Sequence, residues 1–226
     1  MKNIKQLTEM MKLQDKLNNE TNGSGWTSGT TKEGNEIDWY RCARMEAAEL
    51  VDSFQWKHWK DLNGATDEAN VVIELVDIWH FLMSINIGDK FSVEMIENVV
   101  VQTSPLLRVK HDRKSRISFI EDFMKYTFIY DTGTLNVKFF TMLFGNGVDM
   151  DLLYKTYIGK NVLNTFRQNN GYKVGTYIKN WDGDKKEDNE YLQDILNVNN
   201  DLTYDELYGK LEVIYIDEMK KLKPTI

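Results

Sequence analysis

The chain has 226 residues, which is enough to bury one sizeable hydrophobic core, and no shift in composition along it marks a second core. Its 28 basic and 35 acidic residues give a formal net charge of −7, which argues against stable nucleic-acid binding. The single cysteine, Cys42, excludes an internal disulfide and fits a reducing compartment.

The N-terminal segment, residues 1–16, alternates charged and apolar side chains. It therefore lacks the uninterrupted apolar core of a signal peptide, and it is too short to span a bilayer. We expect a cytoplasmic protein that does not associate with membranes.

Apolar residues recur at spacings of three and four through most of the chain, and only Pro105 and Pro224 could interrupt helices. This is the helix period, so the sequence predicts an all-α fold, a helical bundle. We treat residues 1–226 as a single domain with a variable elaboration at about residues 90–150. The expected helices span residues 2–19, 39–60, 67–88, 92–102, 114–130, 134–145, 149–169 and 203–222.

The apolar stripe of the first expected helix ends in two amides. Ile4, Leu7 and Met11 are followed by Gln14 and Asn18 at the same steps of three and four, so all five share one face. A side-chain amide offers both donors and an acceptor, which match the O4 and N3–H edge of a uracil ring. The alternative is a stripe that runs out toward solvent near the helix end.

Two long segments, residues 21–36 and 169–190, are rich in Gly, Asn, Asp and Lys. They also carry four large aromatic side chains: Trp26, Tyr172, Tyr177 and Trp181. Loops of this length in a compact domain are usually functional or disordered, and the aromatic residues favour a function.

Two helices with otherwise apolar surroundings each carry a pair of carboxylates three residues apart. Glu46 and Glu49 lie in the first helix, and Glu74 and Asp77 lie in the second, so each pair projects from one helix face. The segment between them, residues 61–67, has the composition of a turn, which predicts an antiparallel hairpin. The midpoints of the pairs, 47.5 and 75.5, average to 61.5, inside this turn, so the four carboxylates are expected at one level.

Four carboxylates in an apolar setting repel one another unless protons or cations compensate them. All-oxygen ligands at this density suit hard divalent ions, Mg²⁺ first and Mn²⁺ as a substitute. The alternative is a pair of solvated helix faces with accidental spacing. A di-iron site is disfavoured because it needs Glu-x-x-His on two helices, and here only Asp77 and His80 have that spacing. We expect His58 and His80 to pack or to form hydrogen bonds rather than to bind metal.

Basic residues gather in two segments, residues 57–60 and 159–179. They are Lys57, Lys60, Lys160, Arg167, Lys173 and Lys179. In an acidic protein, cations interleaved with Asn and Tyr around glycines suit a polyphosphate, which Arg can bind bidentately and Lys as a point charge. A solvated charge run on a flexible loop is the alternative.

Four stretches of the chain carry a family resemblance: LQDKLNNETNG (13–23), EAAELVDSFQWKHWK (46–60), ELVDIWHF (74–81) and NTFRQNNGYKVGTYIKNWDGDKKEDN (164–189). With these, the sequence resembles the dimeric, all-α dUTPases of the MazG-like NTP pyrophosphohydrolase superfamily. The E-x-x-E and E-x-x-D pairs are shared by the whole superfamily. The N-terminal Gln and Asn, the W-K-H-W-K stretch and the F-R-Q…G-Y-K motif narrow the resemblance to dUTPases.

The resemblance implies hydrolysis of dUTP, and also of dUDP, to dUMP, with pyrophosphate released from dUTP. It further implies Mg²⁺ held by Glu46, Glu49, Glu74 and Asp77, with Glu46 or Glu49 orienting and deprotonating the attacking water. The residues that would contact the substrate are Gln14, Asn18, Trp59, Lys60, Phe81, Asn164, Arg167, Tyr172, Lys173 and Lys179.

The resemblance also implies a homodimer. Some phage-borne relatives bind regulatory proteins, and by analogy residues 90–150 are a natural place for such a partner; a phage-encoded chain would work in the host cytoplasm. The alternative functions are a related dCTPase, a broad NTP pyrophosphohydrolase, or a non-catalytic helical adaptor.

Overall fold

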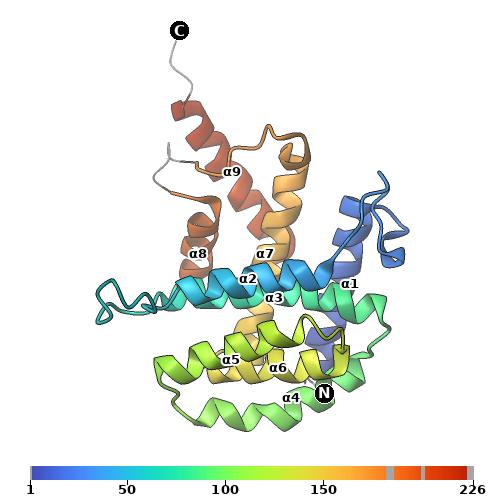
Figure 1. The fold of residues 1–226 in the computed structure, drawn as a ribbon. Coiled ribbons are helices and arrows are strands. Elements are labelled where there is room, and N and C mark those ends of the chain that lie inside the picture. The colour runs from blue at the N-terminus through green and yellow to red at the C-terminus, as the bar shows by residue number, and fades with distance from the viewer. Residues whose placement is uncertain (1, 182–185, 200–201, 223–226) are drawn as a thin grey trace. The chain divides into compact units, whose positions relative to one another are not determined.

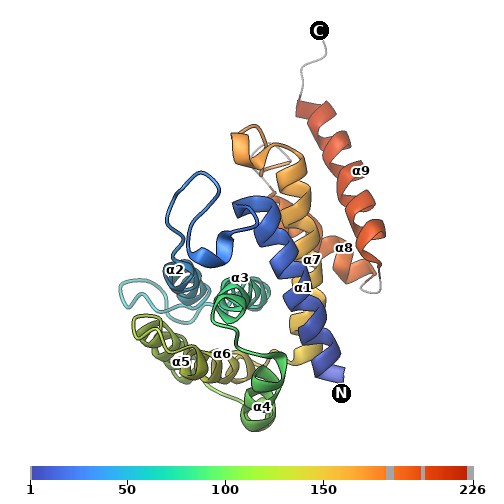
Figure 2. The same ribbon diagram turned by 90° about the vertical axis from the view of Figure 1, so that its right-hand side faces the viewer.

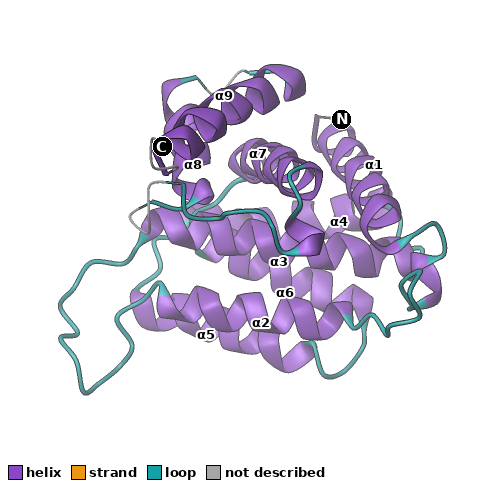
Figure 3. Ribbon diagram, turned by 90° about the horizontal axis from the view of Figure 1, so that it is seen from above, coloured by secondary structure: helices purple, strands orange, loops and turns teal. Residues whose placement is uncertain are grey.

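The computed structural model describes residues 2–181, 186–199 and 202–222. Across these residues the regular elements are helices and no strand forms, so the predicted all-α fold is confirmed (Figure 3). The α-helices are α1 (Lys2–Asn22), α2 (Trp39–Asp52), α3 (Glu68–Gly88), α4 (Val93–Thr103), α5 (Arg113–Tyr126), α6 (Thr132–Gly145), α7 (Met150–Asn169), α8 (Asp188–Val198) and α9 (Tyr204–Leu222) (Figure 1).

Most α-helices begin where a short polar side chain replaces the missing backbone acceptor. In each case the side chain accepts a hydrogen bond from the backbone N–H three residues later, an N-cap that typically stabilises a helix by about 0.5–2 kcal/mol. The residues that do this for α2 to α7 are Asp38, Asp67, Ser92, Asp112, Asp131 and Asp149. Local sequence therefore sets these helix starts.

The chain divides into two compact units, Met1–Thr156 and Tyr157–Ile226, with the boundary inside α7. Compactness alone does not define an independently folding domain, so the single domain expected for residues 1–226 stays a prediction. Each unit is described by itself.

In the first unit, α2 and α3 form an antiparallel hairpin that covers a second pair, α5 and α6 (Figure 2). α1 lies against α3 and α4, so α3 is surrounded by other helices. Trp79 of α3 stacks on Phe139 of α6 with ring centroids 5.1 Å apart, at the centre of this core. Among the described residues α3 is the one helix long and apolar enough to cross a membrane, and 67% of its most apolar window is buried inside the protein, as in a core helix.

The expected helix over residues 39–60 is wrong beyond Asp52. The backbone carbonyl of Ser53 accepts a hydrogen bond from the N–H of Asp67, at 3.0 Å, and the Ser53 hydroxyl accepts one from the Asn70 amide, at 2.9 Å. Phe54 then turns into the core, where it is 2% exposed. These long-range contacts hold residues 53–67 as a loop, which the local pattern did not reveal.

Other helix bounds agree with expectation to within three residues, apart from the end of the helix expected over 114–130, which stops at Tyr126. There the Thr127 hydroxyl donates to the carbonyl of Met124, at 2.6 Å, and Tyr130 adopts a left-handed backbone with φ of 59°. The last helix begins with a capping box, since the Thr203 N–H donates to Glu206 at 2.8 Å and the Glu206 N–H donates to the Thr203 hydroxyl at 3.4 Å.

The second unit contains one helix that was not predicted from the sequence, α8. The aromatic core of this unit is built around Trp181, which is fully buried, packs on Phe166 and stacks on Tyr191. Part of the aromatic content of the long segment 169–190 therefore serves packing.

Candidate active site

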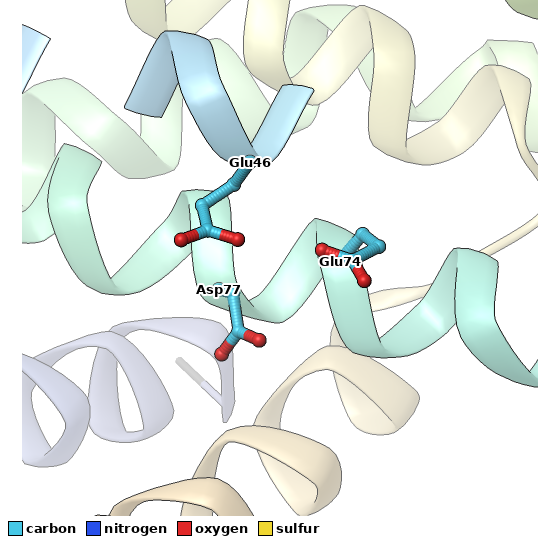
Figure 4. Close-up of side chains that lie close together, drawn as sticks. All are labelled: Glu46, Glu74 and Asp77. Carbon is cyan, nitrogen blue, oxygen red and sulfur yellow. The ribbon is translucent and has the colours of Figure 1, made fainter. Parts of the chain in front are cut away.

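Three of the four predicted carboxylates converge between α2 and α3. Glu46 comes from α2, and Glu74 and Asp77 come from α3; one oxygen of each lies within 4.8 Å of the others (Figure 4). Glu74 is 9% exposed, and the other two are half-buried. We call these three residues the acidic cluster.

The position of the loop explains why Glu49 is outside the acidic cluster. α2 ends at residue 52 and α3 begins at residue 68, so the hairpin is centred on residue 60, not 61.5. Glu46 and Glu74 are each 14 residues from this centre and stand at one level. Glu49 is one helical turn nearer the loop, where it is exposed.

The chemistry of the acidic cluster suits a divalent cation. Its donors are all carboxylate oxygens, the ligands that hard ions prefer. Oxygens on opposite sides of Mg²⁺ lie about 4.2 Å apart, so the cluster can close on such an ion by small side-chain rotations.

The two amides predicted at the end of the α1 stripe form a buried polar network with α3. Gln14 and Asn18 are each 3% exposed, so the alternative in which the stripe runs out to solvent is wrong. The Gln14 Nε2 donates to the Asn18 Oδ1 at 3.0 Å and to the Ser84 Oγ at 3.3 Å, and the Asn18 Nδ2 donates to the same Oγ at 2.9 Å. The Gln14 Oε1 lies 2.7 Å from the Nδ1 of His80, as expected of a hydrogen-bonding histidine.

Sequence reasoning missed Ser84, although a signal was available. It lies four residues after His80, one turn along the same face of a helix that is otherwise strongly apolar. A cavity of about 300 Å³ opens beside it, lined also by Trp26 and Trp39.

Aromatic rings adjoin this cavity, and Trp39 is the second residue that sequence reasoning missed. Phe81, a predicted substrate contact, stacks on Trp39 with ring centroids 5.9 Å apart, and Trp39 meets Trp26 edge to face at 6.0 Å. Trp59, another predicted substrate contact, is 62% exposed in the loop after α2, where it contacts Trp56 and His58. Lys60 is exposed in the same loop.

The remaining residues predicted to contact the substrate belong to the second unit. Arg167 makes a two-pronged ion pair with Asp188, at 2.8 and 2.7 Å, and also donates to Asn164 at 3.2 Å. Asp188 is fully buried and also accepts a hydrogen bond from the Tyr177 hydroxyl; burial and this carboxylate raise the pKa of Tyr177.

The three other predicted substrate contacts in this unit are more accessible. Lys179 pairs with Glu187 at 3.0 Å, while Tyr172 and Lys173 are exposed next to a short 3₁₀ turn (172–174). Arg167 and Lys179 thus have carboxylate partners in this structure, as does Lys57 in the loop after α2, which pairs with Asp52 at 3.0 Å.

Comparison with known proteins gives one clear result. The sequence profile of the family described as dUTPase matches residues 6–172, about three quarters of the chain. The matched range includes the acidic cluster, Glu49 and both buried amides. No curated protein sequence matches the chain at a significant level. The chain therefore belongs to the all-α dUTPase family and is a dUTP-hydrolysing enzyme, a dUTP diphosphatase.

Proposed function

We propose that this enzyme hydrolyses dUTP, and also dUDP, to dUMP in a Mg²⁺-dependent reaction at the acidic cluster, and that it releases pyrophosphate from dUTP. The observation that carries the proposal is the convergence of three carboxylates from two helices within 4.8 Å. This activity would limit uracil incorporation into DNA and supply dUMP.

In this proposal Glu46, Glu74 and Asp77 would hold the ion, together with Glu49, one turn along α2. Bound Mg²⁺, or Mn²⁺ in its place, would neutralise phosphate charge and lower the pKa of a water molecule. Glu46 or Glu49 orients the attacking water and accepts its proton.

The base is recognised by Gln14 and Asn18, with Phe81 and Trp59 as walls around uracil and deoxyribose. The burial of the amides supports this role, because a buried amide left unpaired by the wrong base carries a large penalty. A site that hydrogen-bonds uracil can therefore discriminate against cytosine by about 10⁴ or more.

The phosphates would contact a set of residues that closes over them when the substrate binds. These residues are Lys60, Asn164, Arg167, Tyr172, Lys173 and Lys179. Arg167 already donates to Asp188, Asn164 and Asn189, so it would share its donors with a phosphate, whereas Lys60 and Lys173 would each act as a point charge.

We further propose that the enzyme is a cytoplasmic homodimer and that residues 90–150 offer a surface for a regulatory protein. The dimer rests on the family resemblance, and the regulatory surface rests on analogy with phage-borne relatives.

The test of this function is pyrophosphate release from dUTP, dCTP, dTTP and UTP, each with Mg²⁺ or excess EDTA. We expect cleavage of dUTP alone, lost in EDTA and in Glu74→Gln. The matched control is Glu121→Gln, which removes an exposed carboxylate on α5 and should leave activity unchanged. Activity that survives EDTA would overturn the metal proposal, and equal cleavage of all four nucleotides would overturn the base proposal.

A further inference from the structure

The Ser84 hydroxyl has a fixed direction of donation. It lies 3.0 Å from the backbone carbonyl oxygen of His80, one turn earlier on α3. A carbonyl oxygen can only accept, so the single hydrogen of this hydroxyl is committed to it. Toward its other neighbours the Ser84 Oγ can therefore act only as an acceptor.

This constraint decides which way both amides are turned. The amide groups of Gln14 and Asn18 approach the Ser84 Oγ to 3.3 and 2.9 Å. Because that oxygen can only accept from them, each amide must present its NH₂ group to Ser84 rather than its carbonyl oxygen.

The direction then propagates through the network. One Gln14 N–H points to Ser84 and the other to the Asn18 Oδ1, 3.0 Å away, so both of its donors are used. The Gln14 Oε1 is left facing the His80 Nδ1 at 2.7 Å, which requires the proton on Nδ1. Gln14 thus acts mainly to orient its neighbour.

Asn18 is the member that keeps hydrogen-bonding capacity for a ligand. Of its two N–H groups one binds Ser84, and of the two lone pairs on Oδ1 one accepts from Gln14. One donor and one acceptor remain, in an order that the network fixes. Uracil presents an acceptor at O4 beside a donor at N3, whereas cytosine presents a donor at N4 beside an acceptor at N3, which is the reverse order.

We propose that Ser84 is a positioning residue that sets the hydrogen-bond direction of Asn18 and Gln14 and thereby the preference for uracil over cytosine; this rests on the proposed assignment of these amides to the base. Reversing both amides would aim two carbonyl oxygens at Ser84, whose hydroxyl would have to leave the His80 carbonyl and could satisfy only one of them. All four residues are at most 5% exposed, so water does not compensate readily.

The test compares Ser84→Ala with wild type in the kcat/KM for dUTP and dCTP, and in the binding of dUMP and dCMP by calorimetry without metal. We expect the uracil-to-cytosine ratio to fall at least about tenfold in both measurements, the factor that corresponds to about 1.4 kcal/mol. Ser84→Thr keeps the hydroxyl and should retain the ratio.

The matched control is Thr103→Val on α4. The Thr103 hydroxyl is also buried and donates to the carbonyl four residues earlier, Val99, at 2.7 Å, but it touches no amide of the network. This variant should keep the wild-type ratio. If Ser84→Ala does not fold, Ser84→Cys, with a weaker donor, should shift the ratio in the same direction.

The outcomes separate the two proposals. If kcat/KM and binding fall equally for the uracil and cytosine nucleotides in Ser84→Ala, the ratio is unchanged and Ser84 has a packing role only. This result would overturn the role of Ser84 and leave the proposed function in place. Wild-type enzyme that shows no preference between dUMP and dCMP would instead overturn the assignment of the amides to the base.

Discussion

At the scale of single residues, the acidic cluster brings three carboxylates together, one of them buried. Glu74 is buried and shares a space of 4.8 Å with two other carboxylates. Carboxylate oxygens are the ligands that hard divalent ions prefer, and an ion that binds only the folded state stabilises that state.

We therefore expect Glu74→Gln to remove the rise in melting temperature that Mg²⁺ produces in wild type. The reason is linkage, since an ion stabilises only the state that binds it. Thermal unfolding with EDTA or Mg²⁺ measures this rise, with Glu121→Gln as the control. An equal Mg²⁺ response in Glu74→Gln and wild type would contradict the assignment.

At the scale of helices, α3 and α5 are joined by a two-pronged ion pair. Arg116 of α5 donates to both carboxylate oxygens of Glu68, each at 2.7 Å, and to Asn146 at 2.8 Å. Its guanidinium also lies over the ring of Phe54, 4.9 Å from the centroid. The same arginine thus anchors the start of α3 and the loop that joins α2 to α3.

The hydrogen bonds from Arg116 lower the pKa of Glu68 below its ordinary value of 4.5. The ionised carboxylate therefore contributes stability that is fully present above about pH 4.5 and is lost as the pH falls through the lowered folded-state value. Because the Glu68 side chain is 62% exposed, solvent screening limits this contribution to about 0.2–1 kcal/mol.

We expect Glu68→Gln to be less stable than wild type at neutral pH, with a difference that closes as the solution is acidified. Urea unfolding at several pH values measures the two free energies. A difference that stays constant into the acid range would show that the ionisation of Glu68 does not contribute. Glu121→Gln again controls for the loss of one exposed negative charge.

At the scale of the whole molecule, the surface keeps apolar side chains that a monomer would usually bury. Phe128, Ile129 and Tyr130 are consecutive and each more than half exposed, at the turn between α5 and α6. Larger apolar patches on a protein surface commonly mark association sites. These three exposed side chains are compatible with the homodimer that the family resemblance implies.

We expect the protein to have about twice the 26.5 kDa mass of one chain in light scattering, over a range of dilutions. The physical reason is the removal of exposed apolar surface from water. A single species of 26.5 kDa throughout would contradict the dimer.

The local sequence pattern was sufficient to predict much of the fold and the three carboxylates of the acidic cluster. The helix period, the turn composition after α2 and the spacing of Glu46, Glu74 and Asp77 are properties of short stretches, so they predicted a helix hairpin with facing carboxylates. The amide stripe of α1 was visible in the same way, because side chains on one helix face follow from spacing alone.

The rest depended on contacts between residues far apart in the sequence, which spacing does not encode. Ser53 bonds to Asp67 and ends α2 early, and this places Glu49 a turn outside the acidic cluster. Arg167 forms an ion pair with the buried Asp188, which is 21 residues away in the sequence. The sequence by itself thus determined which helix faces carry the chemistry, whereas only the tertiary structure decided which of those side chains meet, because burial and hydrogen-bond partners are set by packing.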